Sequence, residues 1–231
     1  MIQPSPTAPL GSVTHLPEYT TATFPSSSAI LCRLNAPLVS FAFSLIQRGV
    51  GCRVLGREIG QGLITLVKKL DNGGDDLAVL QQKLEMYESR ETEKLLRRGE
   101  EQAADNIHDR VQCLELFITH SSSVDDLLGR ISALFDDSAS GLLTLSSIHK
   151  AKGLEWPKVF LLDRFELMPS KFAKLPWQQV QERNLIYVAM TRAQIDLVYI
   201  KSGKWLKTEN EKKRAEANSP SSPLLAYADE D

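Results

Sequence analysis

Five short apolar runs are spread along the chain, and each has the length of a buried strand. They are residues 29–33, 52–55, 142–145, 158–162 and 195–200. Between the first two runs, the Asn-Ala-Pro sequence at 35–37 is typical of a helix start and Gly49 of a helix end. Helices are therefore predicted at about 37–48 and, after the second run, at about 62–70. Strands that alternate with helices predict an α/β fold with a parallel sheet.

Residues 71–137 follow a different pattern. Apolar side chains recur there at steps of three and four residues, with charged residues at the other positions. The apolar positions are Leu77, Leu80, Leu84 and Tyr87, and then Ala104, Ile107, Val111, Leu114 and Ile118. This predicts two long amphipathic helices, and a third is predicted at about 124–135. We interpret the region as a small helical subdomain inserted into the sheet domain. Its charged faces are solvated helix surface or, as the alternative, a partner-binding surface.

The remaining segments complete the domain organisation. The sheet domain comprises 29–70 and 138–206, and its last helix is predicted at 177–190. Residues 1–28 are rich in Pro, Ser and Thr, so they are expected to form an extended or poorly ordered linker. Residues 207–231 are dominated by Lys, Glu, Asn, Ser and Pro and are expected to form a flexible tail.

Composition adds a few constraints. The 231 residues are 42% hydrophobic, which is enough to build a core, and the net charge of -2 means that any nucleic-acid contact depends on a local arrangement. The cysteines, Cys32, Cys52 and Cys113, are odd in number and lack metal-ligand spacing. No apolar run reaches the roughly 18 residues that span a membrane. We expect a cytoplasmic protein with reduced cysteines, no metal centre and no membrane contact.

The polar stretch Ser-Ile-His-Lys-Ala-Lys-Gly-Leu-Glu-Trp, at 147–156, lies between two of the predicted strands. Loops that follow buried strands carry the ligand chemistry of open α/β sheets. The donors able to meet phosphate oxygens are His149, Lys150 and Lys152. Gly153 lets a backbone N–H approach a ligand closely, and Glu155 can accept hydrogen bonds from sugar hydroxyls. This set of groups indicates a nucleotide or nucleic-acid site.

Each of these residues also has an ordinary structural interpretation. Lys150 and Lys152 are compatible with plain surface lysines, His149 with a hydrogen-bonded structural histidine, and Glu155 with a carboxylate paired to a nearby lysine. The sequence alone leaves both interpretations open.

Two arginines form a second candidate site. Arg33 lies at the carboxyl end of a predicted strand, and Arg192 lies near the end of a helix that enters the last strand. If they converge at one edge of the sheet, they can clamp a phosphoryl group in transfer. Glu182 and Arg183, by contrast, are interpreted as capping or pairing the start of their helix. The chain contains no Gly-X-X-X-X-Gly-Lys-Ser/Thr P-loop and no Asp-Glu pair suited to hold magnesium, so it carries at most half of an NTPase site.

Three stretches, in this order, resemble motifs of the UvrD/Rep-like superfamily 1 DNA helicases, specifically of their C-terminal RecA-like motor domain. Leu-Cys-Arg-Leu-Asn at 31–35 resembles motif IV, 147–156 resembles motif V, and 182–193 resembles motif VI. Ser147 replaces the usual Thr of motif V, and Trp156 replaces Phe. The resemblance implies a RecA-like, P-loop-NTPase-like parallel sheet flanked by helices.

The resemblance also implies roles for individual residues. Arg33 and Arg192 are expected to contact the γ-phosphate of ATP across an interdomain cleft, and Gly153 and Glu155 to meet the phosphate and the ribose. The residues expected to face single-stranded DNA are Ser147, His149, Lys150 and Lys152. ATP with Mg²⁺ is expected to bind only jointly with an N-terminal P-loop domain. Cys32 stands where several members of the family have a tyrosine that stacks on adenine.

The implied function is ATP-driven translocation on single-stranded DNA with unwinding. The chain alone is expected to have negligible ATPase activity and to need an N-terminal RecA-like domain, in the same or another chain. One alternative is a noncatalytic module that binds single-stranded DNA or protein. Another is a truncated reading frame without an independent role.

Overall fold

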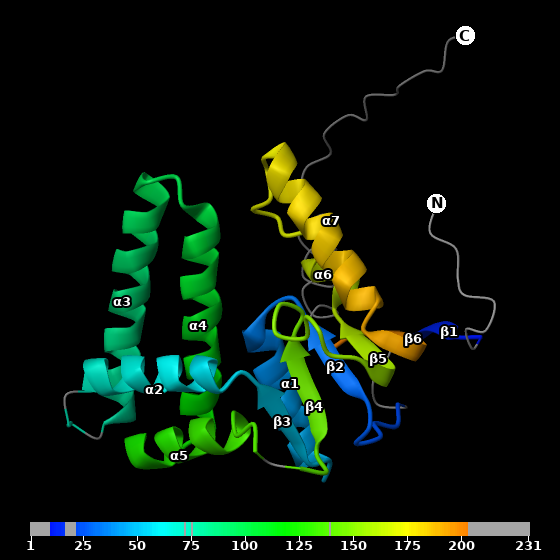
Figure 1. The fold of residues 1–231 in the computed structure, drawn as a ribbon. Helices are drawn as coiled ribbons and strands as arrows, with labels where there is room; N and C mark the ends of the chain where they lie inside the picture. Colours follow the sequence, from blue (N-terminus) through cyan, green and yellow to red (C-terminus); the bar gives the residue numbers. More distant parts are fainter. Residues whose placement is uncertain (1–9, 17–21, 72, 75, 139, 203–231) are drawn as a thin grey trace, which may run out of the picture.

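The structure is a computed structural model that describes residues 10–16, 22–71, 73–74, 76–138 and 140–202. Its centre is an all-parallel sheet of six strands in the order β1-β6-β5-β2-β4-β3 (Figure 1). The strands are β1 (Ser12–Leu16), β2 (Ala29–Cys32), β3 (Cys52–Leu55), β4 (Leu143–Ser147), β5 (Trp156–Leu162) and β6 (Ala193–Ile200). This confirms the predicted α/β, RecA-like class.

Among the residues that the structure describes, seven helices accompany the sheet. They are α1 (Asn35–Gln47), α2 (Arg57–Asp71), α3 (Leu77–Arg97), α4 (Glu101–Thr119), α5 (Val124–Leu134), α6 (Arg164–Leu167) and α7 (Pro176–Met190). Within the described part of the chain, none of them is long and apolar enough to cross a membrane. The cytoplasmic location stays a prediction.

The two faces of the sheet are covered by different elements. Alternate residues of a strand point to opposite faces, so each strand contributes to both cores. The strand residues that face α1, α2, α4 and α5 include Ile30, Cys32, Val54, Leu145, Phe160 and Val198. Those that face α7 and the turn after β4 include Ala29, Leu31, Val159, Leu161 and Leu197. The sheet is thus buried on both faces, as parallel sheets usually are.

The inserted helices pack as part of the first of these cores. Leu84 of α3, Phe117 of α4 and Ile131 of α5 belong to the same buried cluster as residues of β2 and α1. Figure 1 shows α3 and α4 as a long antiparallel pair beside the sheet, and α4 lies against α1. The insert is therefore anchored to the sheet domain along α4.

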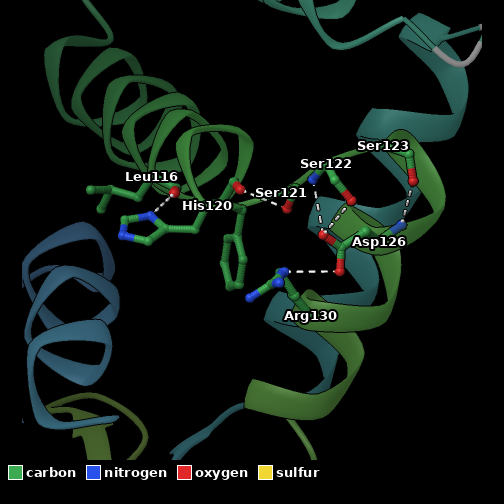
Figure 2. A network of polar contacts seen from close by, with 8 residues as sticks. Leu116, His120, Ser121, Ser122, Ser123, Asp126 and Arg130 are labelled. Carbon is green, nitrogen blue, oxygen red and sulfur yellow. Dashed lines mark hydrogen bonds and ion pairs between the residues drawn. The ribbon is translucent and has the colours of Figure 1, made fainter. Parts of the chain in front are cut away.

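The turn between α4 and α5 is held by a local polar network (Figure 2). Ser123 caps α5, because its Oγ accepts a hydrogen bond from the N–H of Asp126 at 3.1 Å. The Asp126 carboxylate accepts in return from the N–H of Ser122 at 2.9 Å and from Nε of Arg130 at 2.9 Å. The hydrogen bond from Ser122, followed by the one from Arg130, lowers the pKa of Asp126. These contacts fix the direction in which α5 leaves α4 and packs against α2.

The prediction of a linker at 1–28 misses one strand. Residues 12–16 form β1, which pairs in parallel with β6 at the edge of the sheet, and Ser12 Oγ donates to Asp196 Oδ1 at 2.7 Å. Four of the five residues of β1 are exposed, so the segment lacks the apolar signal of a buried strand. Its strand character comes from a partner more than 180 positions away. Residues 1–9 and 17–21, and the predicted tail at 207–231, lie outside the described residues.

Two element boundaries also differ from the prediction. Helix α2 begins at Arg57, about five residues earlier than predicted, because the Asp137 carboxylate accepts from the N–H groups of Gly56 and Arg57 at 3.2 Å each. Strand β4 continues through Ser146 and Ser147, because these residues pair with Leu31 and Cys32 of β2. In both cases contacts that the apolar pattern does not encode extend the element.

Candidate functional site

The carboxyl ends of the parallel strands meet along one edge of the sheet, where open α/β folds bind their ligands. Strand β2 ends at this edge immediately before Arg33, and β4 ends there immediately before the turn at 148–155. The amide of Ile148 donates to the carbonyl of Cys32 at 3.0 Å, so the two segments are hydrogen-bonded to each other. Motifs IV and V therefore lie side by side.

Arg33 is held in a buried ion pair with Glu182 of α7. Arg33 Nη2 lies 2.9 Å and Nε 3.2 Å from Glu182 Oε1, and each side chain is only 6% exposed. The other carboxylate oxygen, Oε2, accepts from the N–H of Ser170 at 3.0 Å. A charge-assisted pair of this kind fixes the orientation of the planar guanidinium. Glu182 thus joins motif VI to motif IV, and the interpretation that it caps the start of its own helix is wrong.

In the turn after β4, two apolar residues face the protein interior and most of the other residues are exposed. Ile148 and Ala151 are almost fully buried in the core beneath α7. Ser147 is only 6% exposed, and its carbonyl accepts from the N–H groups of Lys150 and Ala151 at 3.0 Å each. Ser147 therefore shapes the turn from inside the protein. The exposed residues of the turn are His149, Lys150, Lys152, Gly153, Leu154 and Glu155.

A cavity of about 370 Å³ lies between this turn and α7. Its polar lining consists of His149, Lys152, Gln181, Glu182 and Asn184, with Gln102 from α4. Desolvation and, second, the positive charge of Arg33 lower the pKa of His149, while Glu182 opposes the shift. The lowered pKa favours the neutral imidazole of His149, which offers the cavity hydrogen-bonding capacity without charge. Because its folded-state pKa is depressed, its protonation below about pH 6.5 weakens the folded state.

Lys150 forms an ion pair with Glu58 in the first turn of α2. The hydrogen bond from Lys150 is the main reason why the pKa of Glu58 is lowered. Both side chains are substantially exposed, so water screens this pair. An anionic ligand at the carboxyl edge can therefore compete with Glu58 for the Lys150 ammonium group.

Arg192 lies at the opposite end of the sheet from Arg33, because it immediately precedes the amino end of β6. Its Nη1 donates to the carbonyl of Leu154 at 2.9 Å and its Nε to the carbonyl of Val188 at 3.0 Å. Its own carbonyl accepts from the N–H of Trp156 at 2.9 Å. A residue before a parallel strand and a residue after one lie at opposite edges, so the backbones of the two arginines do not meet at one edge as expected; their joint contact with a phosphoryl group stays a prediction. Within the chain, Arg192 ties the end of the motif V turn to the end of α7.

Gly153 and Glu155 lie on the Arg192 side of the turn. Gly153 has φ +88°, and a Cβ there would meet no atom of the described residues within 4 Å. The Glu155 carboxylate accepts from Gln194 Nε2 at 3.4 Å. The four residues predicted to meet ATP are therefore divided between the two ends of the sheet, with Arg33 apart from the other three.

The sequence interpretation missed three residues that organise this edge. Glu182 was interpreted only as capping or pairing the start of its helix, and Glu58 and Asp109 were not singled out. Because Glu182 lies inside motif VI, the sequence could have marked it as a candidate functional residue. Nothing in the sequence predicts that its partner is Arg33. Asp109 lies on α4 among many other charged residues, and nothing in the apolar pattern distinguishes it.

Comparison with known proteins points to the same family as the sequence motifs. Residues 57–204 match the UvrD-like helicase C-terminal domain family. The ATP-dependent DNA helicase UvrD2 of Mycobacterium tuberculosis is 29% identical over 197 residues, which cover 75% of this chain and 27% of that protein. The ATP-dependent DNA helicase srs2 of Schizosaccharomyces pombe is 36% identical over 108 residues, which cover 45% of this chain and 12% of that protein.

The matched region thus spans about a quarter of UvrD2 and a smaller part of srs2. The family match covers well over half of the 231 residues and includes motifs V and VI and the inserted helices. The chain therefore belongs to the UvrD-like helicase C-terminal domain family.

Proposed function

We propose that this chain is the C-terminal motor domain of an ATP-dependent DNA helicase or translocase, and that it works only with an N-terminal P-loop RecA-like domain. The observation that carries the proposal is the buried Arg33–Glu182 pair beside the motif V turn at the carboxyl edge of the sheet. It holds an arginine in a fixed orientation next to exposed groups suited to DNA. Family membership and the helicase names of both relatives support the same function.

Only part of an ATP site fits the residues present. The guanidinium of Arg33 is a donor that suits phosphate oxygens, and its buried position makes it rigid. Among the described residues, no group of three or more His, Cys, Asp or Glu is arranged to hold a metal ion, so we assign the Mg²⁺ ligands to the N-terminal domain. ATP hydrolysis supplies the energy for cleft opening and closing. Arg33 responds to the γ-phosphate bound by the other domain.

The remaining motif residues receive different roles. His149, Lys150 and Lys152 are exposed on the turn and are assigned to single-stranded DNA. Ser147 and Arg192 are assigned to shaping the turn, because their contacts are with the chain itself. The predicted contacts of Gly153 with phosphate and of Glu155 with ribose are not part of this proposal, because both residues lie on the Arg192 side of the turn, apart from Arg33. In this proposal the turn couples DNA to ATP through its first residue, Ile148, whose N–H donates to the carbonyl of Cys32 immediately before Arg33.

The proposal is tested by joining the 231-residue chain to the N-terminal P-loop domain of a UvrD-like helicase, which we call the completed enzyme. The completed enzyme is expected to hydrolyse ATP faster in the presence of single-stranded DNA, whereas the chain alone has negligible turnover. A coupled assay of ADP release measures both. If the completed enzyme binds single-stranded DNA but shows no turnover, the alternative of a noncatalytic binding module holds instead.

The DNA assignment makes a separate prediction. Each phosphate contact on single-stranded DNA contributes about 0.7 to the slope of log affinity against log salt, so Lys150→Ala/Lys152→Ala is expected to reduce that slope by about 1.4. Fluorescence anisotropy of a labelled oligothymidine at several salt concentrations measures the slope for the 231-residue chain. Glu58→Gln is expected to act in the opposite direction and to raise affinity at low salt, because it releases Lys150.

The control for this prediction removes two exposed lysines from the other end of α2. Lys68→Ala/Lys69→Ala changes the net charge of the chain equally, and both residues lie in the last turn of that helix. This control is expected to leave the slope nearly unchanged. Equal slopes for the two double variants would refute the assignment of Lys150 and Lys152.

A further inference from the structure

Three aromatic rings gather near the carboxyl ends of β1 and β6. His15 of β1 pairs with Tyr199 of β6 in the strand register, and their ring centroids lie 4.6 Å apart with an interplanar angle of 25°. The ring of Phe165, on α6, lies 5.8 Å from that of His15 and 5.2 Å from that of Tyr199. We call His15, Phe165 and Tyr199 the aromatic platform. Strand β1 is the outermost described strand on this side of the sheet (Figure 1), so the platform lies at a corner of the domain.

The turn after β5 places Phe165 on the platform. Asp163 has φ +48°, in the left-handed region, and its N–H donates to the carbonyl of Ile200 at 2.9 Å. Its carboxylate Oδ1 accepts from the N–H of Ser202 at 2.8 Å. These two hydrogen bonds fasten the turn to the end of β6, next to Tyr199. Phe165 is therefore attached to a fixed backbone, while 60% of the residue stays exposed.

Two cations lie beside the rings. The guanidinium of Arg164 lies over the Phe165 ring, 5.4 Å from its centroid. Lys201, directly after β6, forms an ion pair with Glu166 at 2.7 Å. None of the ion pairs among the described residues includes Arg164, so its charge is not neutralised by a described carboxylate. Exposed aromatic faces beside a cation are the two features that bind single-stranded nucleic acid.

The platform lies on the same edge of the sheet as the turn that we assign to DNA. The turn follows β4, whereas the platform lies at the carboxyl ends of β5, β6 and β1. Three strand spacings of about 4.8 Å separate β4 from β6, so the end of β4 lies roughly 14 Å from the platform along this edge. A few nucleotides of an extended single strand cover that distance. A strand bound by His149 and Lys150 can therefore reach the platform.

We propose that the aromatic platform is a second binding site for single-stranded DNA, in which an unpaired base stacks on Phe165. The inference rests on the proposed function, because the turn after β4 supplies the first contact with the strand. Every base has a face that can stack on an aromatic ring, and Arg164 is placed to meet a neighbouring phosphate. An aromatic side chain stabilises a core through its buried area, so the mostly exposed Phe165 contributes little in that way.

The test compares two labelled oligonucleotides of equal length: oligothymidine, and an abasic strand that carries the same phosphates without bases. Phe165→Ala is expected to weaken the binding of oligothymidine to the 231-residue chain about 5-fold or more, and to leave the binding of the abasic strand unchanged. Tyr187→Ala is the matched control, because Tyr187 is 57% exposed and lies on α7 shortly before the amino end of β6, opposite to the platform. It is expected to change neither affinity. Fluorescence anisotropy at a fixed salt concentration measures both.

Phe165→Trp separates stacking from a structural role of the side chain. This variant retains an aromatic face and is expected to bind oligothymidine about as well as the unmodified chain. The fluorescence that the new indole adds is expected to be quenched by oligothymidine and not by the abasic strand. Equal losses of affinity for the two strands in Phe165→Ala, no loss for either, or an absence of quenching in Phe165→Trp overturns the inference.

The same assay distinguishes failure of this inference from failure of the proposed function. If Lys150→Ala/Lys152→Ala weakens binding and Phe165→Ala does not, the platform is refuted while the assignment of the turn to DNA stands. If Phe165→Ala selectively weakens binding of oligothymidine but the completed enzyme has no ATP turnover, the platform stands and the motor function fails.

Discussion

Arg33→Ala is expected to lower the DNA-stimulated ATP turnover of the completed enzyme by about 10³-fold or more, the range over which an arginine acts on a transferring phosphoryl group. The physical reason is that the guanidinium is buried and held by Glu182 before any ligand binds. Its donors therefore need no reorganisation when charge develops on the γ-phosphate. Steady-state turnover at saturating ATP and DNA measures the loss.

The controls for this prediction come from three other substitutions. Arg33→Lys is not expected to restore turnover, because an ammonium group cannot reproduce the planar fork of a guanidinium. Arg57→Ala removes an exposed arginine from the same edge of the sheet and is expected to leave turnover nearly unchanged. Arg192→Ala is expected to have a smaller effect than Arg33→Ala, since it loosens the motif V turn without removing a phosphate contact. A larger effect of Arg192→Ala would reverse the roles of the two arginines.

The apolar pattern was sufficient to predict most of the fold. Strand β3 was predicted at its observed bounds, and the helices at about 124–135 and 177–190 begin or end within one residue of α5 and α7. These elements can be predicted because their buried apolar residues recur at the period of a helix or strand, and this period is visible in the sequence. Strand β1 and the start of α2 were missed because both depend on partners distant in sequence, namely β6 and Asp137.

The candidate site was predictable in its members but only partly in its arrangement. The motif resemblance identified Arg33 and the turn at 147–156, and Arg33 does lie beside the start of this turn at the carboxyl edge of the sheet. It did not reveal that Arg192 lies at the other end, because the distance between two motifs depends on strand order and direction rather than on spacing along the chain. The partners of Arg33 were equally hidden: Glu182 is 149 positions away from it.

Glu182→Ala is expected to lower the free energy of unfolding of the 231-residue chain by about 3–5 kcal/mol, the usual cost of removing one partner of a buried ion pair. The substitution leaves the Arg33 guanidinium, whose side chain is only 6% exposed, without its charged partner. It also removes the acceptor of the N–H of Ser170. Urea unfolding followed by circular dichroism measures the change.

The matched control is Glu93→Ala, which breaks the exposed pair between Glu93 and Arg97 on α3. Exposed pairs of this type contribute about 0.3–0.5 kcal/mol, so this variant should unfold almost like the unmodified chain. Equal losses in the two variants would show that the Arg33–Glu182 pair is not structurally special.

The double variant Arg33→Met/Glu182→Leu separates folding from chemistry. Replacing a buried ion pair with apolar side chains of similar volume is often neutral or stabilising, so this variant should regain most of the stability that Glu182→Ala loses. The corresponding completed enzyme should nevertheless lack DNA-stimulated turnover, because no guanidinium faces the γ-phosphate. A stable double variant that hydrolyses ATP normally would mean that the ion pair only supports the fold. A stable and inactive double variant would mean that an apolar pair supports the fold equally well. The buried ion pair would then be needed for ATP hydrolysis and not for stability.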